Sequence, residues 1–353
     1  MNLLADDIVS AEKLSAEIIL EKGYSKVLIC EEGDFLYSLL KDECTLEKEE
    51  DATSPEIVVA YGGDKTLSRA KALSQSFAIP ATLIPSSMCM SAAIPYYYDE
   101  GPRSVLLSRS LRIVLVDDIL SASRESIKDG FAVAAALLME AFDLAFEDKL
   151  FDRDVESSEK LATFERVAKS LSSIKSFDKT TYKIIKKALL DLVSLRSTNE
   201  NLAYKLYDLS AREGKSDLFS CAYALFAAYI NYERKDIFFT VDRVKVLERS
   251  KEVYSSPYSY AEPIDVEDFS RKNFVVDLYL AELKKSLSSF EKLSSCYRRL
   301  YGSGGYELRN LSLKKILFFL PIVAEAAEGE PLLKTVYLNG YLDPFLLDIF
   351  PVI

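Results

Sequence analysis

Histidine is absent from all 353 residues of the chain. Imidazole is the commonest protein ligand for transition metals and the usual general base near neutral pH. The sequence therefore excludes every mechanism in which a histidine holds a metal ion or carries a proton.

Cysteine is scarce and shows no pairing pattern. The five cysteines are an odd number, and none belongs to a CxxC pair: Cys30, Cys44, Cys89, Cys221 and Cys296. A disulfide framework or a thiolate zinc site uses closer or even-numbered cysteines. We therefore expect free thiols in a reducing, cytoplasmic location.

Long apolar runs and an excess of positive charge are also missing. The apolar segment Ile316–Ala324 contains Pro321 and is too short to span a bilayer. The N-terminus carries Asp6 and Asp7 where a signal peptide has basic and then apolar residues. At a net charge of −11, a broad surface for nucleic acid or anionic membrane is not expected.

Glycine and proline are sparse, with 12 and 11 residues, a composition that favours helices. The length is sufficient for two hydrophobic cores. Near Ser121 the pattern changes from short strands and turns to long helices. This change predicts a boundary between two domains.

The most informative stretch is Ile57–Lys71, with the sequence IVVAYGGDKTLSRAK. Its β-branched run predicts a strand, Gly62 and Gly63 predict a tight turn, and the spacing of Leu67 and Ala70 predicts a helix. Strand, glycine turn and helix start in this order present backbone N–H groups to an anion such as phosphate. The alternative is an ordinary turn between a strand and a helix.

The remaining elements follow from local patterns. Further strands are expected at 26–30, 81–84, 104–107 and 112–116, with a hairpin turn at 96–101. An N-terminal helix is expected to begin at Ser10 and to end at Gly23, and Asp34 is expected to cap a short helix. Long helices are expected at 126–149, 158–173 and 180–195, and further helices up to 348. The first long helix is apolar on all sides and should be buried.

This order of elements resembles the family of glycerol dehydrogenase, sn-glycerol-1-phosphate dehydrogenase, iron-containing alcohol dehydrogenases and dehydroquinate synthase. Those proteins have a strand, the pattern GGG(S/K)xxD, a helix ending in AK, a second strand and the pattern PTxxSxD. The matching residues here are Gly62, Gly63, Lys65, Thr66, Leu67, Ala70, Lys71, Pro85 and Ser87. Asp117–Leu120 resembles the family's VxVDxxxI segment, which closes the α/β domain.

The resemblance implies a dehydroquinate synthase-like architecture. Residues 1–120 would form an α/β, Rossmann-like nucleotide-binding domain, and residues 121–353 an all-α helical domain. NAD(P) is the implied cofactor, and a homodimer is expected by analogy with the family. The short acidic segment 44–55 indicates that one half of the nucleotide-binding domain is trimmed.

The resemblance assigns the cofactor to the glycine turn, to two serines and to one acid: Gly62, Gly63, Asp64, Lys65, Thr66, Ser86, Ser87 and Glu31. Glu31 stands where a family acid holds the adenosine ribose hydroxyls, and its alternative role is an exposed turn residue. Asp64 replaces the third family glycine. It would either repel a pyrophosphate by about 1–4 kcal/mol, depending on exposure, or cap a helix that begins at Lys65 or Thr66.

The family's metal ligands, one Asp and two His, are not retained. By position they correspond to Val133, three residues after Gly130, and to Tyr204 and Phe219. Valine and phenylalanine offer no donor atom to zinc or iron. No metal is therefore expected.

Several other residues leave alternatives open. Three carboxylates near the lost ligands are an alternative all-oxygen metal site, with helix caps and solvated faces as their other role: Asp129, Asp143 and Asp208. The pairs Lys186–Lys187 and Arg298–Arg299 are expected on solvated helix faces, with the rim of a phosphate pocket as the alternative. At the substrate side, Met90 and Ser91 replace the family's Thr and Asp.

Three functions remain. The first is a glycerol dehydrogenase-related oxidoreductase that uses NAD(P) on a polyol or glycerol phosphate without the usual metal. The second is a non-catalytic relative that binds a nucleotide, a phosphorylated polyol or a protein partner in the cleft between the domains. The third is a dehydroquinate synthase-like lyase, a reaction that also needs the missing histidines. Neither nucleic acid nor a membrane is an expected partner.

Overall fold

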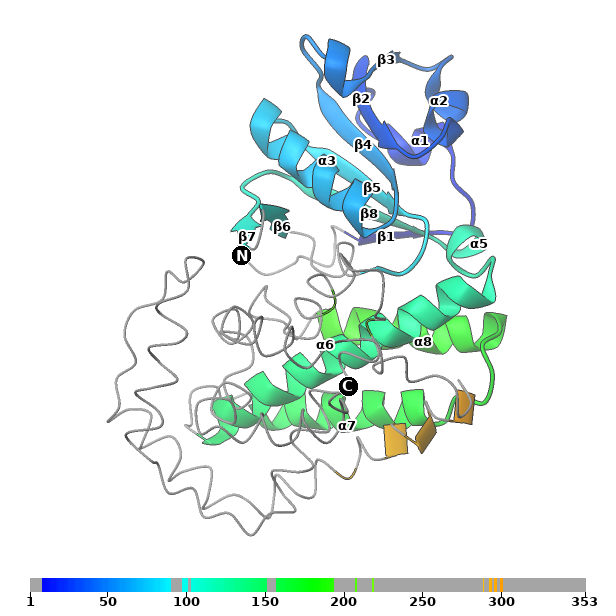
Figure 1. Ribbon diagram of the computed structural model, residues 1–353, viewed down its shortest axis with the longest axis vertical. Coiled ribbons are helices and arrows are strands. Elements are labelled where there is room, and N and C mark those ends of the chain that lie inside the picture. Colours follow the sequence, from blue (N-terminus) through cyan, green and yellow to red (C-terminus); the bar gives the residue numbers. More distant parts are fainter. Residues whose placement is uncertain are drawn as a thin grey trace, which may run out of the picture. The chain divides into compact units, whose positions relative to one another are not determined.

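The computed structural model describes residues 8–89, 97–100, 103–150 and 157–193, together with nine single residues between 207 and 300. Figure 1 shows these residues as coloured ribbons. The chain divides into two compact units. One consists of Met1–Val133 with Phe177–Ser194, and the other of Ala134–Ser176 with Leu195–Ile353.

The first unit contains a six-stranded sheet in the order β1-β8-β5-β4-β2-β3. Its strands are β1 (Ile8–Ala11), β2 (Lys26–Glu31), β3 (Thr45–Glu47), β4 (Ile57–Gly62), β5 (Ala81–Pro85) and β8 (Leu111–Val116). Every pair of neighbours in this sheet is parallel. A hairpin is present as the antiparallel pair β6 (Tyr97–Glu100) and β7 (Arg103–Leu106), but the turn expected at 96–101 was wrong, because residues 97–100 form the strand β6.

Helices cover both faces of this sheet. The helices α1 (Ala16–Ile19) and α2 (Phe35–Leu40) contribute to a buried apolar cluster with one face, which includes Val27, Ile57 and Val114. The helix α3 (Asp64–Phe77) packs on β4 and β5, and the Cys30 thiol on the opposite face of β2 donates to the Thr66 carbonyl at 3.5 Å. The first unit is therefore a three-layer α/β/α arrangement of the Rossmann type.

The N-terminal prediction was wrong. Ser10 lies in β1, and the helix α1 begins only after Ser15, whose hydroxyl accepts from the Ile18 N–H at 3.3 Å. Residue 10 is drawn into the sheet because β1 pairs with β8, where Ser10 stands beside Leu115. This partner lies about a hundred residues further along the chain, so no local pattern indicated it.

The short acidic segment 44–55 retains a strand. It contains β3 at the edge of the sheet and a single 3₁₀ turn, Glu49–Asp51, in place of a longer helix. β3 pairs with β2 over three residues. The trimming expected from the sequence therefore shortens the helical connection but leaves the outer strand in place.

Three long helices are confirmed: α6 (Arg124–Leu150), α7 (Ser157–Ser172) and α8 (Lys179–Val193). Residues 131–138 of α6 are all buried, as their apolar sequence predicted. The predicted helices beyond 195 lie outside the continuous described segments. In the part of the second unit that the structure describes, no residue lies in a strand. None of the described helices has the length and apolar composition needed to cross a bilayer.

Candidate functional site

Three neighbouring strands carry the sequence-predicted cofactor residues to one edge of the sheet. β2 ends at Glu31, β4 ends at Gly62, and β5 is followed by Ser86 and Ser87. Gly62 lies beside Pro85 in the register, and its carbonyl accepts from the Ser86 N–H at 2.9 Å. The structure thus gathers these residues at the carboxyl edge, as the resemblance implied.

This edge includes the switch point of the sheet. After β2 the chain places β3 on one side, and then returns to place β4 on the other side of β2. The connections before and after such a point diverge, which opens a crevice at the carboxyl ends of the two strands. Glu31 and Gly63 follow β2 and β4 at this position.

The two adjacent glycines differ in their surroundings. A Cβ atom on Gly62 would lie 2.8 Å from both Cβ and Oγ1 of Thr66, so the Thr66 side chain fills that space. A Cβ atom on Gly63 would meet no atom within 4 Å. Gly62 is therefore required for packing, whereas Gly63 borders open space that a ligand can enter.

The start of α3 has no side-chain cap. Gly63 is the N-cap residue, and Asp64 is the first residue of the helix, so the alternative in which Asp64 caps a later start was wrong. Acidic residues in a first helical turn interact favourably with the N–H groups there. Lys65, the next residue, is exposed. Asp64 and an incoming phosphate would thus compete for the same positive end of the helix.

Glu31 has a structural role at the end of β2. Its carboxylate accepts from the Leu36 N–H at 2.6 Å and from the Tyr37 N–H at 3.0 Å, and so it caps α2. Asp34, which the sequence indicated for this task, makes no side-chain cap hydrogen bond. An ionised carboxylate has about four acceptor positions, so Glu31 retains acceptor capacity for ligand hydroxyls.

An aromatic pair, which the sequence analysis missed, lies at the same edge. The ring of Phe35, at the start of α2, lies 4.5 Å from the ring of Tyr61, centroid to centroid, and the planes are 31° apart. Phe35 remains 42% exposed although it is fully apolar. The only available signal was that one aromatic residue, Tyr61, directly precedes the glycine turn, and that another, Phe35, shortly follows Glu31.

A second polar cluster lies where β8 meets α5 (Asp117–Leu120). Asp117 Oδ1 accepts a hydrogen bond from the Tyr182 hydroxyl at 2.8 Å and from Lys186 Nζ at 2.5 Å. Tyr182 and Lys186 are four residues apart on α8 and therefore share one helix face. The prediction of a solvated face was wrong for Lys186, whose side chain is only 14% exposed, whereas Lys187 is exposed.

The cluster shifts the pKa values of Asp117 and Tyr182 in opposite directions. Burial opposes ionisation of Asp117, but the hydrogen bonds from Lys186 and Tyr182 and the nearby lysine charges outweigh it and lower the Asp117 pKa. Burial, followed by the hydrogen bond to Asp117, raises the Tyr182 pKa above its ordinary value. The phenol therefore keeps its proton at neutral pH and is not a general base.

Of the three positions that the resemblance assigns to metal ligands, the structure describes Val133 alone. Val133 is buried, with 2% exposure, and has no donor atom. Within the described residues, no group of three or more Cys, Asp or Glu side chains is placed to hold a cation. Of the alternative ligands, Asp129 is exposed on α6, while the Asp143 side chain and Asp208 lie outside the described part, as do Tyr204, Phe219, Met90 and Ser91.

Gly130 keeps a packing role without the metal. A Cβ atom there would lie 3.1 Å from Ile185 Cγ2 on α8 and 3.1 Å from Met88 Cβ, beyond β5. Ile185 and Met88 are both buried. The glycine that precedes the lost ligand position thus allows α6 to approach two apolar side chains closely.

Substitution by alanine should destabilise the protein more at Gly62 than at Gly63. Gly62→Ala should lower the free energy of unfolding by about 1–3 kcal/mol, because the new methyl group overlaps Thr66. Gly63→Ala should lower it by less than about 1 kcal/mol, since its space is open and its backbone suits any residue. Urea unfolding followed by circular dichroism measures both variants. Equal losses would contradict the difference between the two positions.

Asp117→Asn should destabilise the protein at pH 7 by about 1–2 kcal/mol, because it leaves the Lys186 ammonium without its anion. The Asp117 pKa is lower in the folded state than in the unfolded state. Its contribution to the free energy of unfolding is therefore complete above the unfolded-state pKa of about 4, and it is lost as the pH falls through the folded-state pKa. The melting temperatures of the variant and the parent should therefore converge as the pH falls below about 4. Lys187→Asn, on the exposed neighbour, is the control, and a pH-independent difference would contradict the assignment.

Comparison with known proteins identifies the fold. No protein-family model and no curated protein matches the sequence. An iron-containing alcohol dehydrogenase from Thermococcus thioreducens matches with a TM-score of 0.58 and 13% identity, over 99% of each chain. The archaeal halo-thermophilic Red Sea brine pool alcohol dehydrogenase matches with a TM-score of 0.54 and 12% identity, over 99% of this chain and 98% of the other chain. A probable glycerol dehydrogenase from Sinorhizobium meliloti 1021 matches with a TM-score of 0.53 and 14% identity, over 97% of each chain.

At these identities the likeness establishes the fold and leaves the activity to the site. It extends over nearly the whole chain, and the parallel sheet of the first unit and the helices α6 and α7 agree with it. The chain therefore has the two-domain, dehydroquinate synthase-like fold of the iron-containing alcohol and glycerol dehydrogenases, with an α/β, Rossmann-like part followed by a helical part.

Proposed function

We propose that the chain is an NAD(P)-binding relative of the glycerol and iron-containing alcohol dehydrogenases that does not depend on a bound metal. The observation that carries this proposal is the composition of the switch point. An acid at the end of β2, an exposed aromatic ring at the start of α2 and an open glycine turn after β4 lie there. A dinucleotide offers ribose hydroxyls to the acid, an adenine ring to the aromatic residue and phosphates to the glycine turn.

The adenosine half would bind between Glu31 and Phe35. Adenine would stack on the exposed face of Phe35, which Tyr61 supports from the other side. Base–aromatic stacking typically contributes about 1–3 kcal/mol. The ribose hydroxyls would donate to Glu31, whose position is held by its two hydrogen bonds to α2.

The phosphates would lie against Gly63 and the start of α3. The open space beside Gly63 allows a phosphate to approach the backbone, and α3 is a helix of 14 residues whose first N–H groups lack a side-chain cap. Asp64 reduces the attraction for an anion there, and Lys65 offsets part of that repulsion by its charge. The expected affinity is accordingly modest.

Binding without turnover is the function that the described side chains favour. The metal position holds Val133, and the proton of Tyr182 is retained by Asp117. Neither group activates an alcohol. The second candidate is hydride transfer between NAD(P) and a polyol or glycerol phosphate without a metal, and the fold shared with dehydrogenases favours it.

NADH and NADPH titrations test the binding proposal directly. The chain has no tryptophan, so the fluorescence of the reduced nicotinamide can be followed with little protein background. We expect saturable binding with a Kd below about 1 mM. Gly63→Val, which fills the open space without a clash, should weaken binding at least about tenfold while leaving the urea midpoint near that of the parent.

Phe35→Ala should also weaken binding about tenfold, through the lost stacking. Phe77→Ala is the matched control, because Phe77 is likewise exposed, at 36%, but lies at the other end of α3. A parent protein that shows no fluorescence or calorimetric change with either dinucleotide would refute the proposal. Equal effects of the two substitutions would refute the adenine position.

Turnover assays separate the two candidates. Glycerol, glycerol 1-phosphate and dihydroxyacetone phosphate would be tested with NAD(P), in the presence of zinc or iron salts and in the presence of a chelator. The binding-only function predicts no turnover in either condition. Turnover that survives the chelator supports metal-free hydride transfer, and turnover that requires the metal contradicts both candidates.

A further inference from the structure

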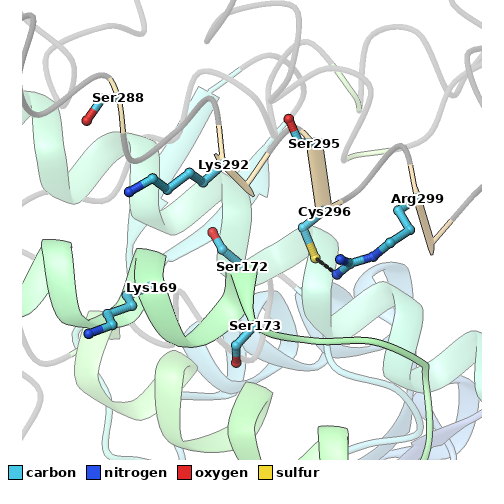
Figure 2. Close-up of a pocket in the computed structure, with 8 residues that line it drawn as sticks. All are labelled: Lys169, Ser172, Ser173, Ser288, Lys292, Ser295, Cys296 and Arg299. Atoms are coloured by element: carbon cyan, nitrogen blue, oxygen red, sulfur yellow. Dashed lines mark hydrogen bonds between the residues drawn. The ribbon is translucent and has the colours of Figure 1, made fainter.

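A basic cavity in the second unit has no assigned role. It has a volume of about 610 Å³ and lies between the C-terminal part of α7 and a set of helical residues between 288 and 299. Figure 2 shows the residues that line it: Lys169, Ser172, Ser173, Ser288, Lys292, Ser295, Cys296 and Arg299. Ser288, Lys292, Ser295 and Arg299 recur every three or four residues, which places them on one helix face.

The charge of this cavity is unusual for the chain. Lys169, Lys292 and Arg299 line it, and none of the described lining residues is acidic, although the whole chain has 55 acidic and 44 basic residues. Neither lysine forms an ion pair with any residue in the described part of the structure. Three cations around one concave surface create a positive potential that attracts a small anion.

Arg299 is fixed at one end of the cavity. One of its terminal nitrogens donates to the Ile174 carbonyl at 2.6 Å and contacts Cys296 Sγ at 3.4 Å. Among the described residues, the other terminal nitrogen and Nε make no hydrogen bond. A guanidinium held in this way is preorganised to donate to a second partner.

The cations have a structural alternative, which accounts for only part of the cluster. Cations near a helix C-terminus offset its partial negative charge, and Arg299 and Lys169, in the last turn of α7, both suit that role. Lys292 comes from the other side of the cavity, and no hydrogen bond joins it to a described carbonyl of α7. Lys292 therefore has no role in ending α7.

The hydroxyl groups limit the kind of anion that fits. Ser172 Oγ donates to the Ala168 carbonyl and Ser173 Oγ to the Ser170 carbonyl, each at 2.7 Å. Because their protons are used in this way, both oxygens face a ligand as acceptors. A ligand that carries both anionic groups and several hydroxyl groups can pair with the cations and donate to both serine oxygens at once.

We propose that this cavity binds a sugar bisphosphate. In Figure 2 the side chains of Lys169 and Lys292 extend toward one end, Arg299 lies toward the other, and Ser172 and Ser173 lie between them. One phosphate pairs with the two lysines, the second pairs with Arg299, and the sugar hydroxyls donate to the serines. The volume of about 610 Å³ lies within the range of small-molecule sites.

Isothermal titration calorimetry of the full chain tests the proposal, with fructose 1,6-bisphosphate, fructose 6-phosphate, fructose and inorganic phosphate as probes. We expect the bisphosphate to bind at least about tenfold more tightly than the monophosphate, and the neutral sugar and inorganic phosphate to bind more weakly than either. Absence of bisphosphate binding at millimolar concentration would overturn the proposal. So would equal affinities for bisphosphate and inorganic phosphate.

Substitutions locate the site. Lys292→Gln should weaken bisphosphate binding at least about tenfold and leave the melting temperature unchanged, because the side chain is exposed and unpaired among the described residues. Lys175→Gln is the matched control: Lys175 is an exposed lysine close to Ser173 that does not line the cavity, and the variant should bind normally. Equal binding by the two variants would place the ligand elsewhere.

The Gly63→Val variant separates this site from the dinucleotide site. It should bind fructose 1,6-bisphosphate like the parent, whether or not NAD(P)H binds to the parent. Loss of bisphosphate binding in Gly63→Val would overturn the assignment to the second unit. The two proposals therefore fail independently.

Discussion

The parallel pairing of β4 with β2 on one side and β5 on the other is the constraint on which the candidate site depends. Parallel neighbours end at the same edge, so Glu31, Gly62 and Ser86 are brought together although 55 residues separate the first from the last. The order of the strands also reverses between β2 and β4, which is the position where open α/β sheets generally bind ligands. A shift of register by one residue would reverse the faces of every side chain on β4 and remove the apolar contacts with α1, α2 and α3.

The glycine turn shows that one motif can serve two purposes. Gly62 is needed because the Thr66 side chain occupies the space where its Cβ would lie, so this glycine follows from packing alone. Gly63 faces open space, and packing does not require it. Packing therefore accounts for the first glycine, and the second is the one that the proposed phosphate position depends on.

The described part of the first unit pairs its buried charge. Val133, which the family resemblance aligns with a metal ligand, is a buried valine on a helix whose residues 131–138 are all buried. The nearest described substitute for a fixed positive charge at the carboxyl edge is Lys186, and Asp117 neutralises it directly. A neutralised pair holds α8 on the end of β8, but it polarises a substrate far less than a divalent cation does.

The sequence by itself determined the elements whose signals are local. The apolar run of α6, the strand–glycine–helix order at β4 and α3, and the absence of histidine all follow from neighbouring residues or from composition. The structure places the cofactor residues proposed from the family resemblance at one edge of the sheet. Whether they bind a dinucleotide stays a prediction, because contact with a ligand is not encoded in their spacing.

Tertiary structure alone decided the features that join distant segments. Ser10 became part of a strand because β8 was available to pair with it, and Glu31 displaced Asp34 as the cap of α2 because the end of β2 holds it over the helix start. Lys186 left the solvent because Asp117, 69 residues earlier, lies within reach. Periodicity and propensity report on a few neighbouring residues, whereas hydrogen bonds and ion pairs depend on distances in space that only the folded chain sets.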